Sequence, residues 1–180
     1  MKFKQFAKKQ AGMTLMELIA SLSVMAVVVV GALALYNSAN SSEQSTSLSK
    51  DLHAVRAATQ HIFQGQGSYG VAGTNLNDIL VSANKIPTSI RVDSATTPDT
   101  LTHKANGTVN VASTGTSGTS FAITMTNIPI DVCIPLMSQS TGGWTSIKAG
   151  TAAKRTTFPI TPTVAEADCK TGTTMVFTAS

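Results

Sequence analysis

The sequence predicts an α+β fold in which one long N-terminal helix, its hydrophobic half protruding, packs on an antiparallel β-sheet head with one C-terminal disulfide. Three observations predict it. The stretch from Met13 to Tyr36 is almost wholly apolar. Apolar positions then recur with helical period as far as Phe63. Short segments rich in β-branched residues follow, and the part beyond Gly65 has about the size that one modest core requires.

Residues 1–12 form a basic leader that accounts for the whole net charge. Four of the 13 basic residues lie there without any acidic residue, and the nine others balance the nine acidic residues of the chain; the four are Lys2, Lys4, Lys8 and Lys9. The pI of about 9.2 therefore does not indicate an anionic partner. The remaining charges are scattered, without a basic cluster among aromatic residues, so we expect no direct binding of nucleic acid.

Residues 13–36 form an apolar segment long enough to cross a bilayer. A helix of this length spans roughly 36 Å. The basic leader places the N-terminus in the cytoplasm, because no further basic residue occurs before Lys50, and the chain beyond Tyr36 is then exported. A cleaved secretory signal fits less well, because the apolar run is too long and no small-x-small site follows it. Glu17 within this run would cost roughly 2.5–3.5 kcal/mol deep in a membrane, so its carboxylate calls for a partner.

Residues 37–64 are predicted to continue the helix as an amphipathic half that packs on the head. The segment has no Pro or Gly before Gly65, and apolar residues recur at helical spacing from Leu48 through Leu52 and Val55. Gly65 and Gly67 are expected to end the helix. The weakest helical stretch is Val27–Val30 followed by Gly31. β-Branched residues have a low helix propensity, and Gly costs about 1 kcal/mol in a helix interior.

Residues 65–107 are predicted to connect the helix to a sheet region that spans residues 108–180. The connection contains one apolar piece, Leu76–Val81, that suits a short helix. Ser113–Ser120 suits a hairpin loop, or else a linker. Alternation of apolar and polar residues at period two is clearest around Phe121. The predicted strands are Thr108–Ala112, Thr119–Thr126, Ile128–Ile134, Thr156–Ile160 and Thr173–Thr178.

Cys133 and Cys169 are predicted to form a disulfide. They are the only cysteines, and both lie in the exported part, where disulfides persist. A metal site is the alternative, but no CxxC or paired-histidine spacing accompanies them.

No catalytic, metal or cofactor site is predicted. His53, His61 and His103 are expected to be solvated or capping histidines, and no nucleophile-elbow pattern occurs. The acidic residues Asp131, Glu166 and Asp168 follow no calcium-loop spacing. The sequence therefore predicts a protein that is not an enzyme.

The stretch Gly12-Met13-Thr14-Leu15-Met16-Glu17 resembles the processing signature of type IV pilin precursors. The resemblance implies cleavage after Gly12 by a prepilin peptidase, an N-methylated Met13, and Glu17 as the fifth residue of the mature chain. A first mature Met and a C-terminal part rich in Ser, Thr and Gly are similar to the type IVb branch, and within it to the PilS-type thin-pilus pilins of conjugative plasmids. The signature covers only the leader and the first half of the helix.

The signature also has a physical reading. Cleavage would leave a positive amine on Met13, which can pair with the Glu17 carboxylate of a neighbouring helix. Lipid is as apolar as a helix bundle, so moving the helix into a filament gains little hydrophobic free energy. The charge pair would instead fix the register, since either charge left alone carries a desolvation penalty of several kcal/mol.

The resemblance implies the major subunit of a pilus used in conjugation, adhesion or cell contact. Expected partners are further copies of the chain, the prepilin peptidase, an inner-membrane assembly platform with its ATPase motor, and an outer-membrane secretin. The precursor would lie in the inner membrane with a periplasmic head and would then join an extracellular filament. A minor pilin or type II secretion pseudopilin, and a membrane-anchored periplasmic binding domain, are the alternatives.

Overall fold

The computed structural model describes residues 14–140 and 142–180, and its first element is the helix α1 (Leu15–Ile62). Contacts divide the chain into two units, one ending at Ala39 and one running from Asn40 to Ser180. Residues Gly12 and Met13, to which the sequence assigns leader cleavage, lie outside the described residues.

In the first unit, α1 is regular and every residue from Leu15 to Asn40 is exposed. The helix continues through the β-branched run and through Gly31, the position that the sequence marks as weak. No Pro interrupts the hydrogen-bond ladder, so the helix satisfies its own backbone groups between its ends.

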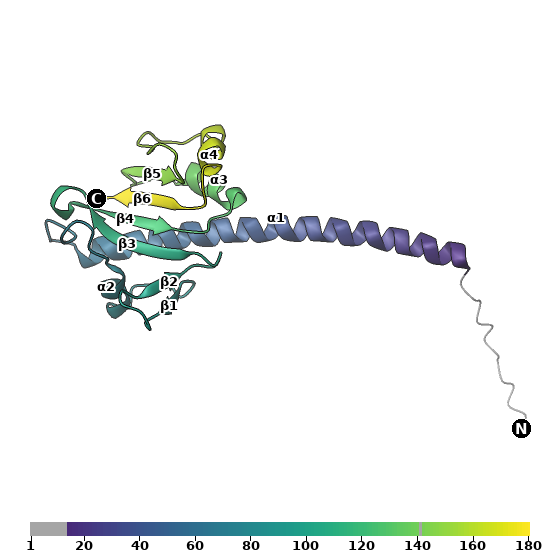
Figure 1. Cartoon of the computed structure of the whole chain (residues 1–180), viewed down its shortest axis with the longest axis horizontal. Coiled ribbons are helices and arrows are strands. Elements are labelled where there is room, and N and C mark those ends of the chain that lie inside the picture. Colours follow the sequence, from purple (N-terminus) through teal and green to yellow (C-terminus); the bar gives the residue numbers. More distant parts are fainter. Residues whose placement is uncertain (1–13, 141) are drawn as a thin grey trace, which may run out of the picture. The chain divides into compact units, whose positions relative to one another are not determined.

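The second unit contains one six-stranded antiparallel sheet in the order β1-β2-β3-β4-β6-β5 (Figure 1). Its longest pairing joins β3 to β4, with Val111 opposite Ile123. β6, the last element of the chain, lies between β4 and β5, so the C-terminal segment is built into the sheet. The strands are β1 (Arg91–Asp93), β2 (Thr100–Thr102), β3 (Thr108–Thr114), β4 (Ser120–Met125), β5 (Ser146–Ala149) and β6 (Met175–Ala179).

Four short helical elements complete this unit: α2 (Asn77–Ser82), the 3₁₀ turn η1 (Thr116–Gly118), α3 (Ile130–Gln139) and α4 (Pro162–Cys169). Asn77 attaches α2 to the sheet, because its side-chain amide accepts the Val111 N–H at 3.0 Å and donates to the Asp99 carbonyl at 2.9 Å. The α2 prediction is therefore confirmed to within one residue, and η1 lies in the predicted Ser113–Ser120 loop.

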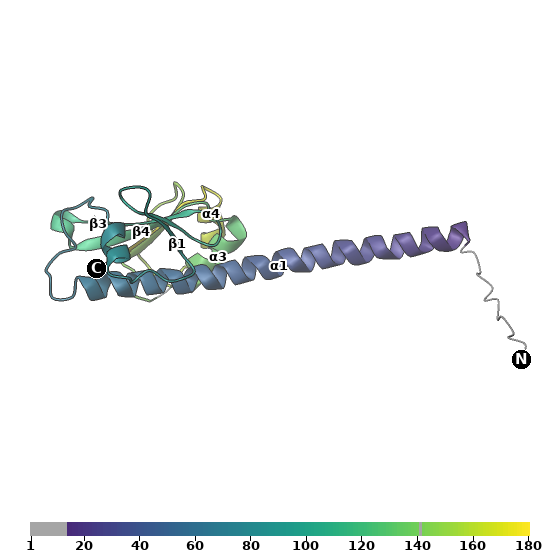
Figure 2. The same ribbon diagram turned by 90° about the horizontal axis from the view of Figure 1, so that it is seen from below.

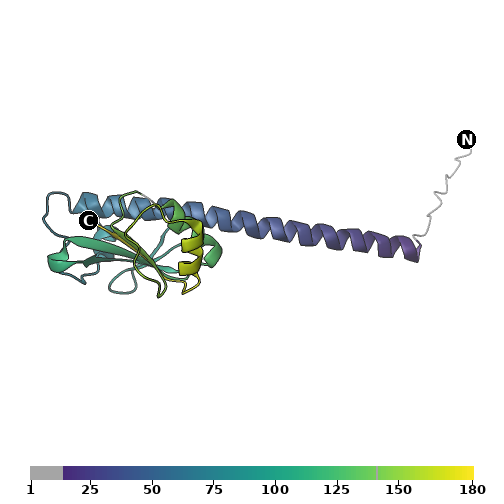
Figure 3. The same cartoon turned by 90° about the horizontal axis from the view of Figure 1, so that it is seen from above.

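The core lies between the sheet and the second half of α1, which follows one face of the sheet (Figure 2). Leu48, Leu52 and Val55 of this half are at most 2 % exposed and join the core cluster that includes Phe121 and Phe177. The amphipathic pattern read from the sequence thus identifies the buried stripe correctly. The C-terminus comes back beside α1, where the Gln60 side chain donates to the Ser180 carbonyl at 3.1 Å (Figure 3).

The disulfide prediction is confirmed: Cys133 in α3 is bonded to Cys169 at the end of α4, with their Cα atoms 6.0 Å apart. Both cysteines are at most 5 % exposed. The bond therefore fixes two short helices to each other inside the core, where neither is long enough to be stable alone.

The prediction of a strand at Ile128–Ile134 is wrong, because this segment enters α3. Apolar residues alternate from Ile128 to Ile134, which imitates a strand. The buried residues of α3 instead follow a helical stripe, Val132, Cys133, Leu136 and Met137. Pro129 precedes the helix with extended backbone (φ −62°, ψ 152°) and so begins it.

The prediction of a strand at Thr156–Ile160 is also wrong. Only Arg155, just before this segment, makes an isolated bridge to Ile147 of β5. Pro159 has no N–H to donate to a ladder, and β-branched composition alone does not make a strand. Three strands of the sheet, β1, β2 and β5, have no counterpart among the predicted strands.

Removing the disulfide should destabilise this unit. The bond closes a 36-residue separation, so Cys133→Ser with Cys169→Ser is expected to lower the free energy of unfolding by roughly 3–4 kcal/mol. Trp144, the only Trp, is 5 % exposed and packs on Phe177 with ring centroids 5.3 Å apart, so its fluorescence reports the unfolding in urea. A variant with Ser138→Ala, also in α3, serves as a control and should shift the midpoint far less.

Candidate assembly interface

The first half of α1 exposes fourteen large apolar side chains on all sides of the helix. Their exposed fractions run from 48 % at Leu18 to 80 % at Leu15. An 18-residue window of α1 has a mean hydropathy of 2.7, and none of it is buried. A helix that is apolar all round requires an apolar environment such as a bilayer or a bundle of like helices. The fourteen are Leu15, Met16, Leu18, Ile19, Leu22, Val24, Met25, Val27, Val28, Val29, Val30, Leu33, Leu35 and Tyr36.

Thr14 and Glu17 form the start of α1. The Glu17 N–H donates to the Thr14 carbonyl at 3.0 Å and to Thr14 Oγ1 at 3.3 Å. Thr14 is thus the N-cap, and Glu17 is the third residue of the helix, where a negative charge faces the positive end of the helix dipole. Thr14 is a residue that the sequence analysis did not single out, although Thr-x-x-Glu is the spacing of a capping box.

Glu17 is the one charged residue between Leu15 and Tyr36. Among residues 14–140 and 142–180, its carboxylate has no ion-pair or hydrogen-bond partner. The site therefore consists of an exposed apolar helix with a single acid at its capped end. Its chemistry suits the pairing of Glu17 with a cation supplied by another chain.

The three histidines do not share one environment: two are exposed and one is buried. His53 and His61 are exposed on α1, in agreement with the solvated reading. His103 lies in a loop, as expected, but its side chain is only 2 % exposed, so it is a buried residue that caps a turn rather than a solvated one. Its Nδ1 accepts the Ala105 N–H at 3.2 Å, which leaves Nε2–H to donate to the Thr126 carbonyl at 2.9 Å. This neutral imidazole holds the turn between β2 and β3.

Asp168 and Glu166, two of the acidic residues weighed as calcium ligands, each pair with a basic side chain. Asp168 takes two hydrogen bonds of 2.7 Å each from the Arg155 guanidinium, which raises the pKa of Arg155. Lys170 pairs with Glu166 at 2.7 Å and lowers the pKa of Glu166. Within the residues that the structure describes, no group of three His, Cys, Asp or Glu side chains is placed to hold a metal ion.

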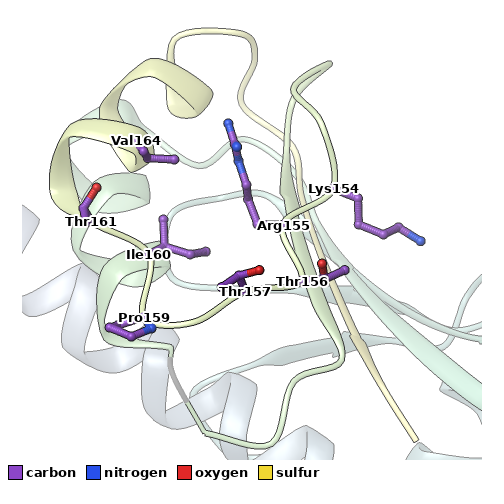
Figure 4. A pocket seen from close by; sticks show the side chains of 8 residues that line it. All are labelled: Lys154, Arg155, Thr156, Thr157, Pro159, Ile160, Thr161 and Val164. Carbon is purple, nitrogen blue, oxygen red and sulfur yellow. The ribbon is translucent and has the colours of Figure 1, made fainter.

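An open hollow of about 320 Å³ lies between the segment that precedes α4 and the start of α4. Figure 4 shows Lys154 extending away from the other lining side chains. The lining contains no histidine, cysteine or carboxylate, so it offers neither a nucleophile with a base nor metal ligands. The lining residues are Lys154, Arg155, Thr156, Thr157, Pro159, Ile160, Thr161 and Val164.

Comparison with known protein families gives two matches that together cover most of the chain. The family described as PilS N terminal matches residues 42–180. The prokaryotic N-terminal methylation motif matches residues 7–33, which include the proposed cleavage position and Glu17. The search of curated proteins found no match.

Two solved structures share the fold. The type IV b pilin from Salmonella typhi is 25 % identical, with a TM-score of 0.59, over 72 % of this chain and 95 % of that one. TcpA, a type IV pilin from Vibrio cholerae El Tor biotype, is 17 % identical, with a TM-score of 0.54, over 77 % and 99 % of the two chains. Both likenesses agree with a long helix packed on an antiparallel sheet.

The buried His103 should make the head less stable in mild acid. Burial lowers the pKa of His103 below its usual 6.5, although the hydrogen bond to Thr126 and the charge of Asp51 act in the opposite direction. The unfolded chain then binds the proton more readily, so the stability is complete above pH 6.5 and declines as the pH falls below it. We therefore expect a lower free energy of unfolding at pH 5 than at pH 7.5.

Urea midpoints of the wild type, His103→Gln and His53→Gln at the two pH values measure this effect. His103→Gln should remove most of the pH dependence, and the exposed His53→Gln should leave it unchanged. Lysine partners lower the pKa of Glu43 and of Glu166 below the usual 4.5. Protonation of these two carboxylates therefore destabilises the head only at a pH below this window. An equal decline in His103→Gln would contradict the assignment.

Proposed function

This chain belongs to the PilS family of type IV pilins, and we propose that it is the major structural subunit of a type IVb pilus. The filament would serve cell contact, adhesion or conjugative mating. The observation that carries the proposal is the wholly exposed apolar half of α1 behind an N-terminal methylation motif. The fold and family are those of structural pilins and not of enzymes.

The exposed helix needs two successive environments. Each large apolar side chain left in water forgoes about 1.5–3 kcal/mol, so the segment is stable only in a bilayer or against other apolar helices. The bilayer holds the precursor, with the basic leader in the cytoplasm and the head in the periplasm. Copies of the same helix provide the second environment in the filament.

Glu17 sets the register of that assembly. Transfer from lipid to a helix bundle changes apolar burial little, so specificity has to come from polar groups. We assign to Glu17 the pairing with the Met13 amine of a neighbouring copy. Cleavage after Gly12 creates this amine, and N-methylation of Met13 keeps its positive charge. The match of the methylation motif to residues 7–33 supports these three roles.

The proposed division of the chain follows from these roles. Residues 1–12 are the leader that a prepilin peptidase removes, residues 13–36 are the membrane and polymerisation segment, and residues 37–180 are the exported head. The head comprises the amphipathic helix half (37–64), the connecting region (65–107) and the sheet with the disulfide (108–180). An inner-membrane platform with its ATPase motor and an outer-membrane secretin would move the subunit from the inner membrane to the cell surface.

The mature N-terminus tests the proposal directly. Surface fibres sheared from cells should consist mainly of this chain, beginning at Met13 with an added methyl group, as an intact-mass measurement will show. If the fibres contain the chain only in traces, it is a minor pilin or a pseudopilin. Fibres that contain the chain with its leader uncut would contradict the processing. A chain that is absent from fibres and stays in the membrane with its N-terminus at Met1 would favour the membrane-anchored binding protein.

Substitution of Glu17 tests the register. Glu17→Ala should still be inserted and cleaved, yet filament yield should fall by more than about a hundredfold, because an unpaired amine stays buried. Immunoblots of sheared fibres and of membranes measure both quantities. Ser21→Ala is the matched control, since it removes a polar group one turn away, where the hydroxyl only bonds the Leu18 carbonyl at 2.9 Å. Normal pili from Glu17→Ala would rule out the role.

A further inference from the structure

Strand β1 is an open edge of the sheet. It pairs with β2 on one side only, and Arg91, Val92 and Asp93 are all exposed. Val92 is 38 % exposed and is one of few large apolar side chains of the head at the surface. An open edge offers unpaired N–H and C=O groups to another strand, and proteins usually protect it with short length and with charge.

The side chains of β1 fall on two faces. Val92 stands opposite Leu101 of β2, which is fully buried, so Val92 lies on the core face of the sheet. Arg91 and Asp93 stand opposite Thr102 and Thr100 on the other face. Asp93 Oδ1 accepts the Ala95 N–H at 3.0 Å, whereas the Arg91 guanidinium has no partner among the described residues.

The sequence Arg-Val-Asp is complementary to itself. If a second β1 pairs antiparallel around Val92, each Arg91 comes opposite an Asp93, and the two Val92 side chains come opposite each other. Opposite charges in cross-strand pairs stabilise a sheet, and like charges in the same place destabilise it. An edge with charges of one sign would repel a second copy of itself. The charges of β1 instead attract a second copy.

We propose that β1 is a self-association edge that pairs antiparallel with β1 of a second copy of this chain in a neighbouring filament. This rests on the proposed function as a filament subunit. The pairing is isologous, with one patch on both partners related by a two-fold axis. Subunits along one filament are joined head to tail by heterologous contacts, so a two-fold axis of this kind relates subunits of two different filaments. The partner is thus a second pilus, and the result is lateral bundling.

Repetition makes so short an edge effective. A contact of three residues with two exposed ion pairs is too weak to hold two free heads together. Along two filaments, each contact formed raises the effective concentration of the next, so weak contacts add up. Because the ion pairs are exposed, bundling should also weaken as salt is raised.

Charge reversal and charge exchange test the pairing. Pili carrying Arg91→Asp, Asp93→Arg or both changes are compared with the wild type by low-speed pelleting and negative-stain electron microscopy in 0.15 M NaCl. Each single change makes every cross-strand pair like-charged, so the bundled fraction should fall by more than about fivefold. The double variant restores opposite pairs and should return to within about twofold of the wild type. Lys154→Asp, an exposed reversal elsewhere on the head, should bundle normally.

The outcomes separate this inference from the proposed function. If no fibres contain the chain, the proposed function fails. If fibres form and the double variant bundles no better than the single ones, or Lys154→Asp bundles equally poorly, the β1 pairing is overturned. If a single reversal abolishes the filaments themselves and the double variant restores them, the contact lies within one filament, and the pairing between filaments is wrong.

Discussion

An apolar helix that stays exposed along its whole first half is the constraint on which the rest of this protein depends. No residue of that half is buried, so the chain is stable only where a bilayer or other helices surround it. The proposed membrane stage and the proposed filament would both meet this need. In the proposed filament, the single acid at the capped start of the helix would supply what apolar contact lacks, a preferred position along the axis.

The head meets a different requirement, since in the proposed filament it would have to remain folded in an oxidising space outside the cytoplasm. Aromatic residues make up only 5 % of the chain, so few large side chains anchor the core. The disulfide between α3 and α4 and the C-terminal strand inside the sheet compensate by fixing the last third of the head. Arg56 adds a further link, with its guanidinium 5.1 Å from the Trp144 ring centroid and a 2.9 Å hydrogen bond to the Gly142 carbonyl.

The two regions also differ in the strength of the signals that they leave in the sequence. Helical period persists over many turns of α1, and the alternation around Phe121 spans a full strand, so both elements were predicted. The segment around Ile130 imitates a strand because seven residues are too few to distinguish alternation at period two from a helical stripe. Strands β1 and β2 have three residues each, which is less than one repeat of any reliable pattern.

The class of fold, the apolar helix with its lone acid, the processing motif and the disulfide can all be read from the amino-acid sequence, because each depends on local composition or on the presence of only two cysteines. The burial of His103, the pairing of Asp168 with Arg155 and the open edge of the sheet at β1 become visible only in the folded chain. These depend on residues far apart in the chain that are brought together by strand order. The order of the strands decides which side chains are buried, which charged residues meet and which strand lies at the edge of the sheet, and no local sequence pattern specifies that order.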